Sequence, residues 1–489
     1  MENIVTFLNS VLWSTPVIYI VLVVGLLFSF LTRFLQLRHL KEMIKLMFQG
    51  KSSEAGVSSF QALSIALSGR VGTGNIAGVA TAIAFGGPGA IFWMWFMAFI
   101  GASTAFIEST LAQIYKVKHN GQYRGGPAYY IEKGIGSKWF AVVFAGAAII
   151  AMAILMPGVQ SNSIASGMNN AFGLPPYITG LAVILLLGFI IFGGVKRIAN
   201  AAQVIVPVMA LGYILLSIII VIMNISELPN VIALIFKSAF NLEATFGGLM
   251  GMAIAWGVKR GIYSNEAGQG TGAHPAAAAE VSHPVKQGLV QAFSVYIDTL
   301  LVCSATAFMI LFTGMYNTES PDGKMIVNNI PGVEVGPGFT QAAIDSQLPG
   351  FGSGFVAIAL FFFAFTTIMA YYYIAETNVT YLLGSKNNKL ISFALKLVLL
   401  AATFYGSIKT ANLAWALGDV GLGVMVWLNM IAIIILTKPA VKALKDYESQ
   451  KKQGLDPVFR PKSLGIKNAD FWENDYKEQT DSAKKSSIS

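Results

Sequence analysis

Four glycines lie within the ten residues from Gly69 to Gly78, and Thr73 and Asn75 stand among them. The segment is strongly apolar, because no charged side chain occurs from Val71 to Ile107. Each glycine inside a helix costs about 1 kcal/mol relative to alanine, so the cluster predicts a membrane-spanning helix that is interrupted. Freed N–H groups at the positive end of a half-helix suit a carboxylate, and freed carbonyls suit Na⁺. Such interrupted helices form the binding sites of secondary transporters.

This glycine cluster fits two other patterns. Small residues also permit close helix packing, but packing alone does not account for Thr73 and Asn75. Residues 72–77 fit the dinucleotide pattern G-x-G-x-x-A, which requires a βαβ unit and an acidic residue about 20 positions later. Because no Asp or Glu follows before Glu108, we set the dinucleotide interpretation aside.

Three charged residues inside apolar segments are candidates for gating or coupling. Arg70 is costly at membrane depth without a partner, so we expect it to act as a gate paired with Glu108, Asp298 or Asp419. A clamp for a substrate carboxylate is the alternative role for Arg70. Glu108 and Asp298 each fall in the second span of a predicted half, where they serve either ion coupling or hydrogen bonding between helices.

Four uncharged polar residues in apolar segments are further candidates. The hydroxyls of Thr366 and Thr367 would complete a sodium shell, unless each bonds to the preceding turn of its own helix. Gln160 and Asn162 follow Pro157 and Gly158, and they would hold a polar group of the substrate or bridge two helices.

The composition places the chain in a membrane. Of 489 residues, 55% are hydrophobic and 12% are charged, whereas soluble proteins carry about 25% charged residues. The net charge of +9 does not indicate nucleic-acid binding, because the basic residues are scattered over loops between apolar segments. The single cysteine, Cys303, excludes a disulfide within the chain and suggests no Cys-based metal site.

The apolar segments predict an all-α membrane protein with eleven spans. An amphipathic basic stretch, residues 33–51, follows the first span and is expected at the membrane surface. Five spans (58–224) and five more (246–436) follow, so the two halves must be inverted relative to each other. The second half also opens on a glycine-rich span, residues 246–251. The spans are expected near residues 12–34, 58–83, 89–116, 138–168, 176–193, 199–224, 246–263, 287–314, 351–381, 389–405 and 410–436.

Charge asymmetry sets the expected orientation in the cell membrane. If the stretch 33–51 is cytoplasmic, most Lys and Arg residues fall inside, which puts the N-terminus outside and the C-terminus inside. The loop 315–349 then lies outside and caps a vestibule. The polar tail is expected to be cytoplasmic and largely disordered. The corresponding units are residues 1–57, 58–225, 226–436 and 437–489.

Several blocks of the chain carry a family resemblance. Residues 86–95 (GGPGAIFWMW) resemble the signature of the alanine or glycine:cation symporter family. Residues 69–78, 257–268 and 297–299 are similar to other blocks of that family, and the resemblance covers nearly everything except the tail. It implies Na⁺- or proton-coupled uptake of a small neutral amino acid. It also implies the LeuT-type 5+5 inverted repeat of the APC superfamily, here with one extra N-terminal helix.

The resemblance also implies roles for particular residues. Thr73, Gly74 and Asn75 would meet the carboxylate and amine of the substrate. Thr366 and Thr367 would join backbone carbonyls of the broken helix around Na⁺. The backbone carbonyls implied as Na⁺ ligands are those of Gly69 and Gly72. The residues implied to close the other side of the substrate are Phe246, Gly248 and Gly251.

One position departs from the family pattern. The family usually continues after Thr367-Ile368 with a Leu-Gly-Trp-like sequence, whereas this chain has Met369-Ala370-Tyr371. Tyrosine in place of tryptophan changes the volume of the pocket and adds a hydroxyl. Tyr371 is therefore a candidate substrate contact, and glutamine joins alanine and glycine as a candidate substrate.

These observations predict an amino-acid:Na⁺ symporter that works by alternating access, with no cofactor beyond the coupling ion. Its partners would be an amino acid, Na⁺ and membrane lipid. Proton coupling through Glu108 or Asp298 is the alternative. A channel would need a continuous polar lining, and an intramembrane enzyme would need a catalytic constellation that the sequence does not contain.

Overall fold

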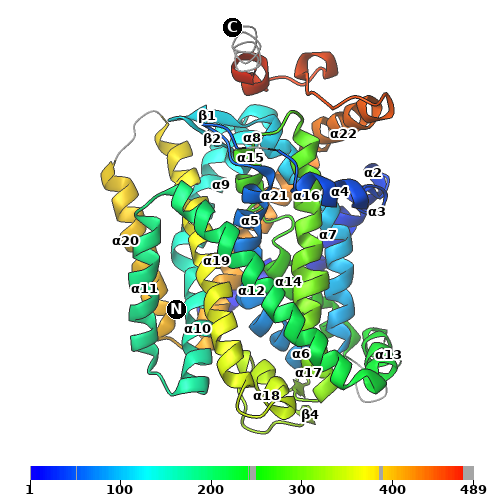
Figure 1. The fold of residues 1–489 in the computed structure, drawn as a ribbon, viewed down its shortest axis with the longest axis vertical. Coiled ribbons are helices and arrows are strands. Elements are labelled where there is room, and N and C mark those ends of the chain that lie inside the picture. The colour runs from blue at the N-terminus through cyan, green and yellow to red at the C-terminus, as the bar shows by residue number, and fades with distance from the viewer. Residues whose placement is uncertain (1, 51, 241, 243–248, 385–388, 477–489) are drawn as a thin grey trace.

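The computed structural model describes residues 2–50, 52–240, 242, 249–384 and 389–476, and these are mostly helical (Figure 1). The helices form a bundle. The ends of the bundle differ: α8, α15, α22 and the β1–β2 hairpin lie at one end, and α6, α17, α18 and β4 lie at the other. The only sheets among these residues are two antiparallel hairpins, β1–β2 and β3–β4.

The N-terminal part contains two bent or broken helices. A bend of 40° separates α1 from α2, and a break at Val71 and Gly72 separates α5 from the π-helical turn η1. Ser58 and Gln61 start α5 with a reciprocal cap, in which each side-chain oxygen accepts from the other residue's backbone N–H. The elements are α1 (Glu2–Leu12), α2 (Thr15–Leu31), α3 (Leu35–Arg38), α4 (Leu40–Met47), α5 (Ser59–Arg70), η1 (Gly74–Gly78) and α6 (Val79–Gly86).

A long helix and a short hairpin follow. The hairpin turns at Asn120 and Gly121, both at positive φ (49° and 72°), which is the typical sequence of a two-residue hairpin turn. Pro207 lies inside α12. The elements are α7 (Gly89–Ile114), β1 (Val117–His119), β2 (Gln122–Arg124), α8 (Pro127–Tyr130), η2 (Ile131–Ile135), α9 (Lys138–Ile150), η3 (Ala151–Leu155), α10 (Pro157–Phe172), α11 (Pro176–Ile191), α12 (Val195–Met223), η4 (Ile225–Glu227) and α13 (Leu228–Ala239).

The remaining elements contain a second broken helix, α14–α15, and the loop 315–349. That loop forms β3, β4 and α18, and Thr318 Oγ1 anchors it by donating to the Ile83 carbonyl at 3.1 Å. The elements are α14 (Met250–Asn265), α15 (Ala273–Ala278), α16 (Pro284–Val295), η6 (Tyr296–Cys303), α17 (Ser304–Thr313), β3 (Asn317–Glu319), β4 (Met325–Asn328), α18 (Pro337–Gln347), α19 (Gly352–Leu383), α20 (Lys389–Ser407), α21 (Ala411–Ile435), α22 (Thr437–Lys452), η7 (Pro461–Leu464) and η8 (Phe471–Asp475).

By length and apolarity, seven helices among the described residues can cross a membrane, or up to eight if α1 and α2 form one bent span. Each of the eleven predicted spans contains at least one helix. The segments with shorter apolar helices are Gly74–Gly86 and Pro176–Ile191. A mostly helical protein with several apolar helices is therefore confirmed. The full count of eleven spans stays a prediction.

The tail differs from the expectation of disorder. Residues 437–476 form α22, η7 and η8, and Trp472 is buried against the end of α7, where its Nε1 donates to the Gln113 carbonyl at 2.8 Å. Four buried aromatic residues of this segment, Tyr447, Phe459, Phe471 and Trp472, explain the difference, because they bury apolar area although the surrounding sequence is highly charged. Residues 477–489 lie outside the described part of the chain.

Candidate functional site

The predicted interruption of the first long segment is confirmed. Helix α5 ends at Arg70, Val71 leaves the helical region (φ −75°, ψ 88°), and η1 begins at Gly74. The backbone N–H of Gly72 donates to Asn75 Oδ1 at 2.8 Å, so a side chain replaces the missing helical acceptor. A Cβ at Gly72 would clash with Thr367 Oγ1, which explains the glycine by close approach.

Three side chains meet at the start of η1. The backbone N–H of Thr73 donates to Gln160 Oε1 at 3.1 Å, and Gln160 Nε2 donates to the Tyr371 hydroxyl at 3.2 Å. The Tyr263 ring completes this cluster, since a Cβ at Gly74 would lie 3.3 Å from it. Thr73 Oγ1 is buried and has no hydrogen-bond partner within the described residues, whereas the Tyr263 hydroxyl lies beside Gln160 and Tyr371. An unused hydroxyl beside the positive end of a half-helix is suited to bind a carboxylate.

The two adjacent threonines of α19 have different surroundings. Thr367 Oγ1 lies 2.9 Å from the Ser68 carbonyl oxygen of α5 and 3.0 Å from that of Phe363. Thr366 Oγ1 donates only within its own helix, to the Phe363 carbonyl at 3.0 Å. Only Thr367 therefore faces the break, where its hydroxyl, the Ser68 carbonyl and the nearby backbone of Gly72 bring hard oxygen ligands together.

Asp298 supports the break from η6. Its carboxylate accepts hydrogen bonds from Asn75 Nδ2 at 2.7 Å, from Thr299 Oγ1 at 2.7 Å and from Ser264 Oγ at 2.9 Å. Asn75 is thus held between Gly72 and Asp298. The buried carboxylate is satisfied by hydrogen bonds, and it orients the amide that caps the broken helix.

Arg70 is buried, and within the described residues it forms no ion pair within 4.0 Å. Its Nη1 donates to Ser294 Oγ and to the Gln291 carbonyl, while Nε and Nη2 have no hydrogen-bond partner in the described part of the chain. Glu108 accepts from Gly270 N at 3.1 Å and from Asn429 Nδ2 at 2.9 Å. The expected pairing of Arg70 is therefore not found in the described residues: Glu108 and Asp298 lie near the guanidinium without forming an ion pair with it.

Asp419 belongs to a different cluster. It binds Lys259 Nζ at 2.6 Å and Arg260 Nη1 at 2.9 Å, and the Arg260 guanidinium lies 4.3 Å from the Trp415 ring centroid. Lys259 and Arg260 lie within the helix α14. Because both cations pair with this carboxylate, α14 can carry them in the interior of the bundle.

Sequence reasoning missed the second break, residues 266–272. Glu266 adopts the left-handed conformation (φ 56°), and Gly268 and Gly270 follow at φ 87° and 85°. A Cβ at Gly272 would clash with Arg70 Nη2, so the two breaks are in contact. The alternating glycines of this loop, like those of residues 72–74, were the available signal.

Residues 246–251, the glycine-rich start of the predicted second half, give no support for a binding site. Phe246 and Gly248 lie outside the described residues, and Gly251 is exposed with nothing within 4 Å of a Cβ built on it. Asn162 also lies apart from the cluster around Gln160. Its Nδ2 donates to the carbonyls of Gly406 at 3.2 Å and Lys409 at 2.6 Å, so it bridges α10 and the end of α20.

A helical membrane protein with two broken helices in contact has the architecture of a secondary transporter. The model of the sodium:alanine symporter family matches residues 1–461, and the chain belongs to that family. It is accordingly a multi-pass membrane transporter and not an enzyme.

Individual relatives agree with this assignment, and a solved structure shares the fold. The putative sodium/proton-dependent alanine carrier protein YrbD of Bacillus subtilis is 78% identical over 98% of this chain and 99% of its own length. The probable sodium/glutamine symporter GlnT of the same organism is 46% identical, covering 94% of this chain and 93% of its own. The structure of a Na⁺-coupled sialic acid symporter has the same overall fold, with a TM-score of 0.52, 14% identity and coverage of 92% and 93%.

Proposed function

We propose that this protein imports a small neutral amino acid, foremost alanine, together with Na⁺ by alternating access across the cell membrane. The observation that carries the proposal is the break at residues 71–73, which brings unused polar groups and oxygen ligands to one place. Membership of the sodium:alanine symporter family and the names of its relatives point to the same cargo and ion.

The amino acid would bind at the start of η1. Its carboxylate would accept from the backbone N–H and hydroxyl of Thr73 and from the Tyr263 hydroxyl, and Gln160 would turn away from the Thr73 N–H as the substrate enters. Gly74 and Asn75 form the adjoining backbone. Tyr371, whose hydroxyl accepts from Gln160 Nε2, would lie beyond Gln160 as a further contact of the amino acid.

The sodium ion would bind beside the amino acid. The hydroxyl of Thr367 and the carbonyls of Ser68, Gly69 and Gly72 are its proposed ligands. Both sites share the unwound backbone, so each ligand stabilises the closed form that the other requires. That shared stabilisation couples the inward sodium gradient to uptake.

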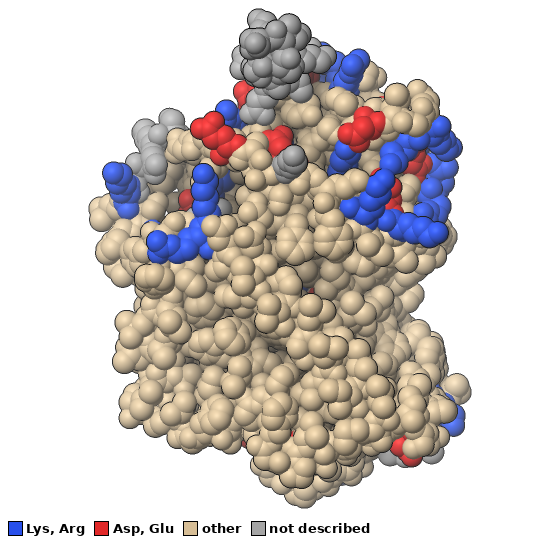
Figure 2. Space-filling model, viewed as in Figure 1, with Lys and Arg blue, Asp and Glu red and all other residues tan. Residues whose placement is uncertain are grey.

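We further propose eleven spans, with two inverted sets of five after the N-terminal helix. The cytoplasmic end would be the one with α22, because Lys and Arg gather there and a belt with few charges follows (Figure 2). The N-terminus would then lie outside and the C-terminus inside. The segment with β3, β4 and α18 would cover the outer end.

Uptake into proteoliposomes tests the proposal. Purified protein should accumulate labelled alanine in a saturable manner when an inward sodium gradient is imposed, and it should not do so when the gradient is absent. A panel of unlabelled amino acids then defines the cargo, and competition by glutamine would extend it to that amide. Accumulation driven by a pH gradient without Na⁺ would support proton coupling instead. Equal uptake with and without both gradients would contradict symport.

A further inference from the structure

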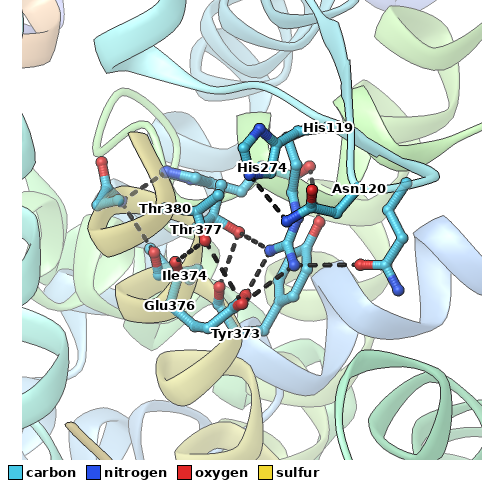
Figure 3. Close-up of polar contacts among 11 residues, drawn as sticks. His119, Asn120, His274, Tyr373, Ile374, Glu376, Thr377 and Thr380 are labelled. Atoms are coloured by element: carbon cyan, nitrogen blue, oxygen red, sulfur yellow. Dashed lines mark hydrogen bonds and ion pairs between the residues drawn. The ribbon is translucent and has the colours of Figure 1, made fainter. Parts of the chain in front are cut away.

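An ion pair connects the β1–β2 hairpin with α19 at the end of the bundle where α15 and α22 lie (Figure 3). Both terminal nitrogens of Arg124 contact the Glu376 carboxylate, with Nη2 at 3.1 Å from Oε1, and Nη1 also donates to Thr377 Oγ1 at 3.0 Å. The side chains are only 7% and 17% exposed. A two-pronged, largely desolvated pair of this kind holds two elements in one relative position.

The same cluster reaches α15, which follows the second break. The hydroxyl of Tyr373, one turn before Glu376 on α19, donates to the His274 carbonyl at 3.3 Å. The His274 ring lies 2.9 Å from Asn378 Nδ2 and packs against Gly126, whose φ of +132° suits only glycine. Three elements therefore meet around Tyr373 and His274: the β1–β2 hairpin, α19 and α15. Figure 3 labels side chains from each of them.

Two cavities lie on either side of this cluster. The first, the surface cavity, has a volume of about 210 Å³ and opens at the surface of the protein. Its lining includes Gln122, Arg124 and Tyr373. The inner one, about 10 Å³, is lined by Gly69 and Glu266 at the two breaks and again by Tyr373. The inner space holds a single water at most. Tyr373 lines both cavities, and its hydrogen bond to the His274 carbonyl holds it between them.

We propose that the Arg124–Glu376 pair, with Tyr373, is the gate between the surface cavity and the binding site. The proposal rests on the proposed function in taking the two breaks as the binding site. The gate is closed in this structure, and opening requires α19 to separate from the hairpin. Loss of the Glu376 charge leaves the buried guanidinium without its counter-ion, which disfavours the closed form and increases the population of the open one.

The gate can be tested by the accessibility of a buried thiol. Ala66 lines the inner cavity and is 3% exposed, and the single native cysteine, Cys303, is buried and serves as the background. The reporter Ala66→Cys in purified protein would be treated with a bulky hydrophilic maleimide, with neither Na⁺ nor amino acid present. Adding Glu376→Gln should raise the labelling rate about tenfold, the change expected if an open form rises from about 1% to about 10%.

Two further variants make the result specific. Asp470→Asn removes another ion pair of the same end, Lys133–Asp470 at 2.8 Å, which lines neither cavity, and it should leave the rate unchanged. The exchange Arg124→Glu with Glu376→Arg should bring the rate back toward that of the reporter alone. An unchanged rate in Glu376→Gln, or an equal rise in Asp470→Asn, would overturn the gate. Tyr373→Ala gives an independent opening if Glu376→Gln fails to fold.

The assay contains no transported solute, so its outcome is separate from that of the uptake experiment. If labelling responds as expected but no amino acid accumulates, the gate stands and the assigned cargo is wrong. If uptake is sodium-driven but labelling does not respond, the assigned gate is wrong and the transport function stands.

Discussion

Thr366 and Thr367 are identical in chemistry and adjacent in sequence, yet only Thr367 reaches across to α5. A helix turns by about 100° per residue, so neighbouring side chains point to different faces. In α19 this rotation gives Thr367 the Ser68 carbonyl and leaves Thr366 bonded to its own preceding turn. The pair therefore contains both a proposed ion ligand and its matched control.

Replacing Thr367 with valine should weaken sodium binding. The valine has nearly the same shape but lacks the oxygen, and a bond to a charged group is worth about 1.5–3 kcal/mol. The sodium concentration that gives half-maximal alanine uptake should rise by about tenfold or more. Thr366→Val should leave that concentration unchanged. Equal effects of the two substitutions would remove Thr367 from the ion site.

The C-terminal segment shows at the scale of elements how an apparently polar tail becomes ordered. It crosses the end of the bundle from α22 to η8, and Lys116, at the end of α7, inserts its ammonium among three rings of the hairpin and tail. The ammonium also donates to the Ala279 carbonyl at 3.0 Å. These contacts tie α7, the hairpin and the loop before α16 to one another.

Trp472→Ala should release this segment. Removing a buried tryptophan typically costs about 3–5 kcal/mol, and here it also removes the hydrogen bond to Gln113. Limited proteolysis should then cut within residues 453–476 much faster than in the unaltered protein. Leu455→Ala is the control, because Leu455 lies in the same segment and is 53% exposed. Equal cleavage in all three proteins would mean that other contacts hold the segment.

The stability of the packing between the C-terminal segment and α16 is expected to depend on pH through His283. Its ring lies at the start of α16 against Tyr447 and Phe459, with Asp446 at 3.2 Å from Nε2. Burial lowers the pKa of His283 below its ordinary 6.5, although Asp446 opposes the shift. The unfolded chain therefore takes up a proton near pH 6.5 while the folded protein does not, so this contribution to stability is lost as pH falls below 6.5.

The melting temperature should accordingly fall less between pH 7 and pH 5.5 in His283→Gln than in the unaltered protein. The matched control is His119→Gln, which changes a partly exposed histidine of the hairpin. It should reproduce the pH dependence of the unaltered protein. The assignment fails if His283→Gln retains the full decrease.

At the scale of the whole molecule, charge is distributed in two ways. On the face shown in Figure 2, Lys and Arg residues gather at the end that carries α22. Lys259 and Arg260 are exceptions, because they pair with Asp419 inside the bundle and are flanked by Trp256 and Trp415. This cluster joins α14, the helix of the second break, to α21.

Asp419→Asn should strongly destabilise the protein, because it leaves two buried cations without a counter-ion. Breaking such a cluster costs about 3–5 kcal/mol, and the melting temperature in detergent should fall accordingly. Asp322→Asn removes an exposed pair with Lys324 (3.5 Å, side chains 61% and 84% exposed) and should have no measurable effect. Comparable melting of both variants would show that the buried cluster does not hold the bundle together.

Much of this architecture was already determined by the sequence alone. Apolar runs located a helix in each of the eleven predicted spans, and glycine density located the break at residues 71–73, because hydropathy and backbone preference depend on nearby residues. The same local reasoning picked out Asn75, Gln160, Thr367 and Tyr371, which the fold gathers around the break. It misjudged the tail and overlooked the loop 266–272.

Only the tertiary structure decided which of these residues meet. Asp419 pairs with Arg260, 159 positions away, and Trp472 bonds to Gln113, 359 positions away. The tertiary structure also gave Thr367 and Thr366 different partners, and likewise Gln160 and Asn162. The packing of distant helices also ordered the tail. Such pairings depend on how distant helix faces pack and on which polar groups that packing buries, and no local feature of a chain records either.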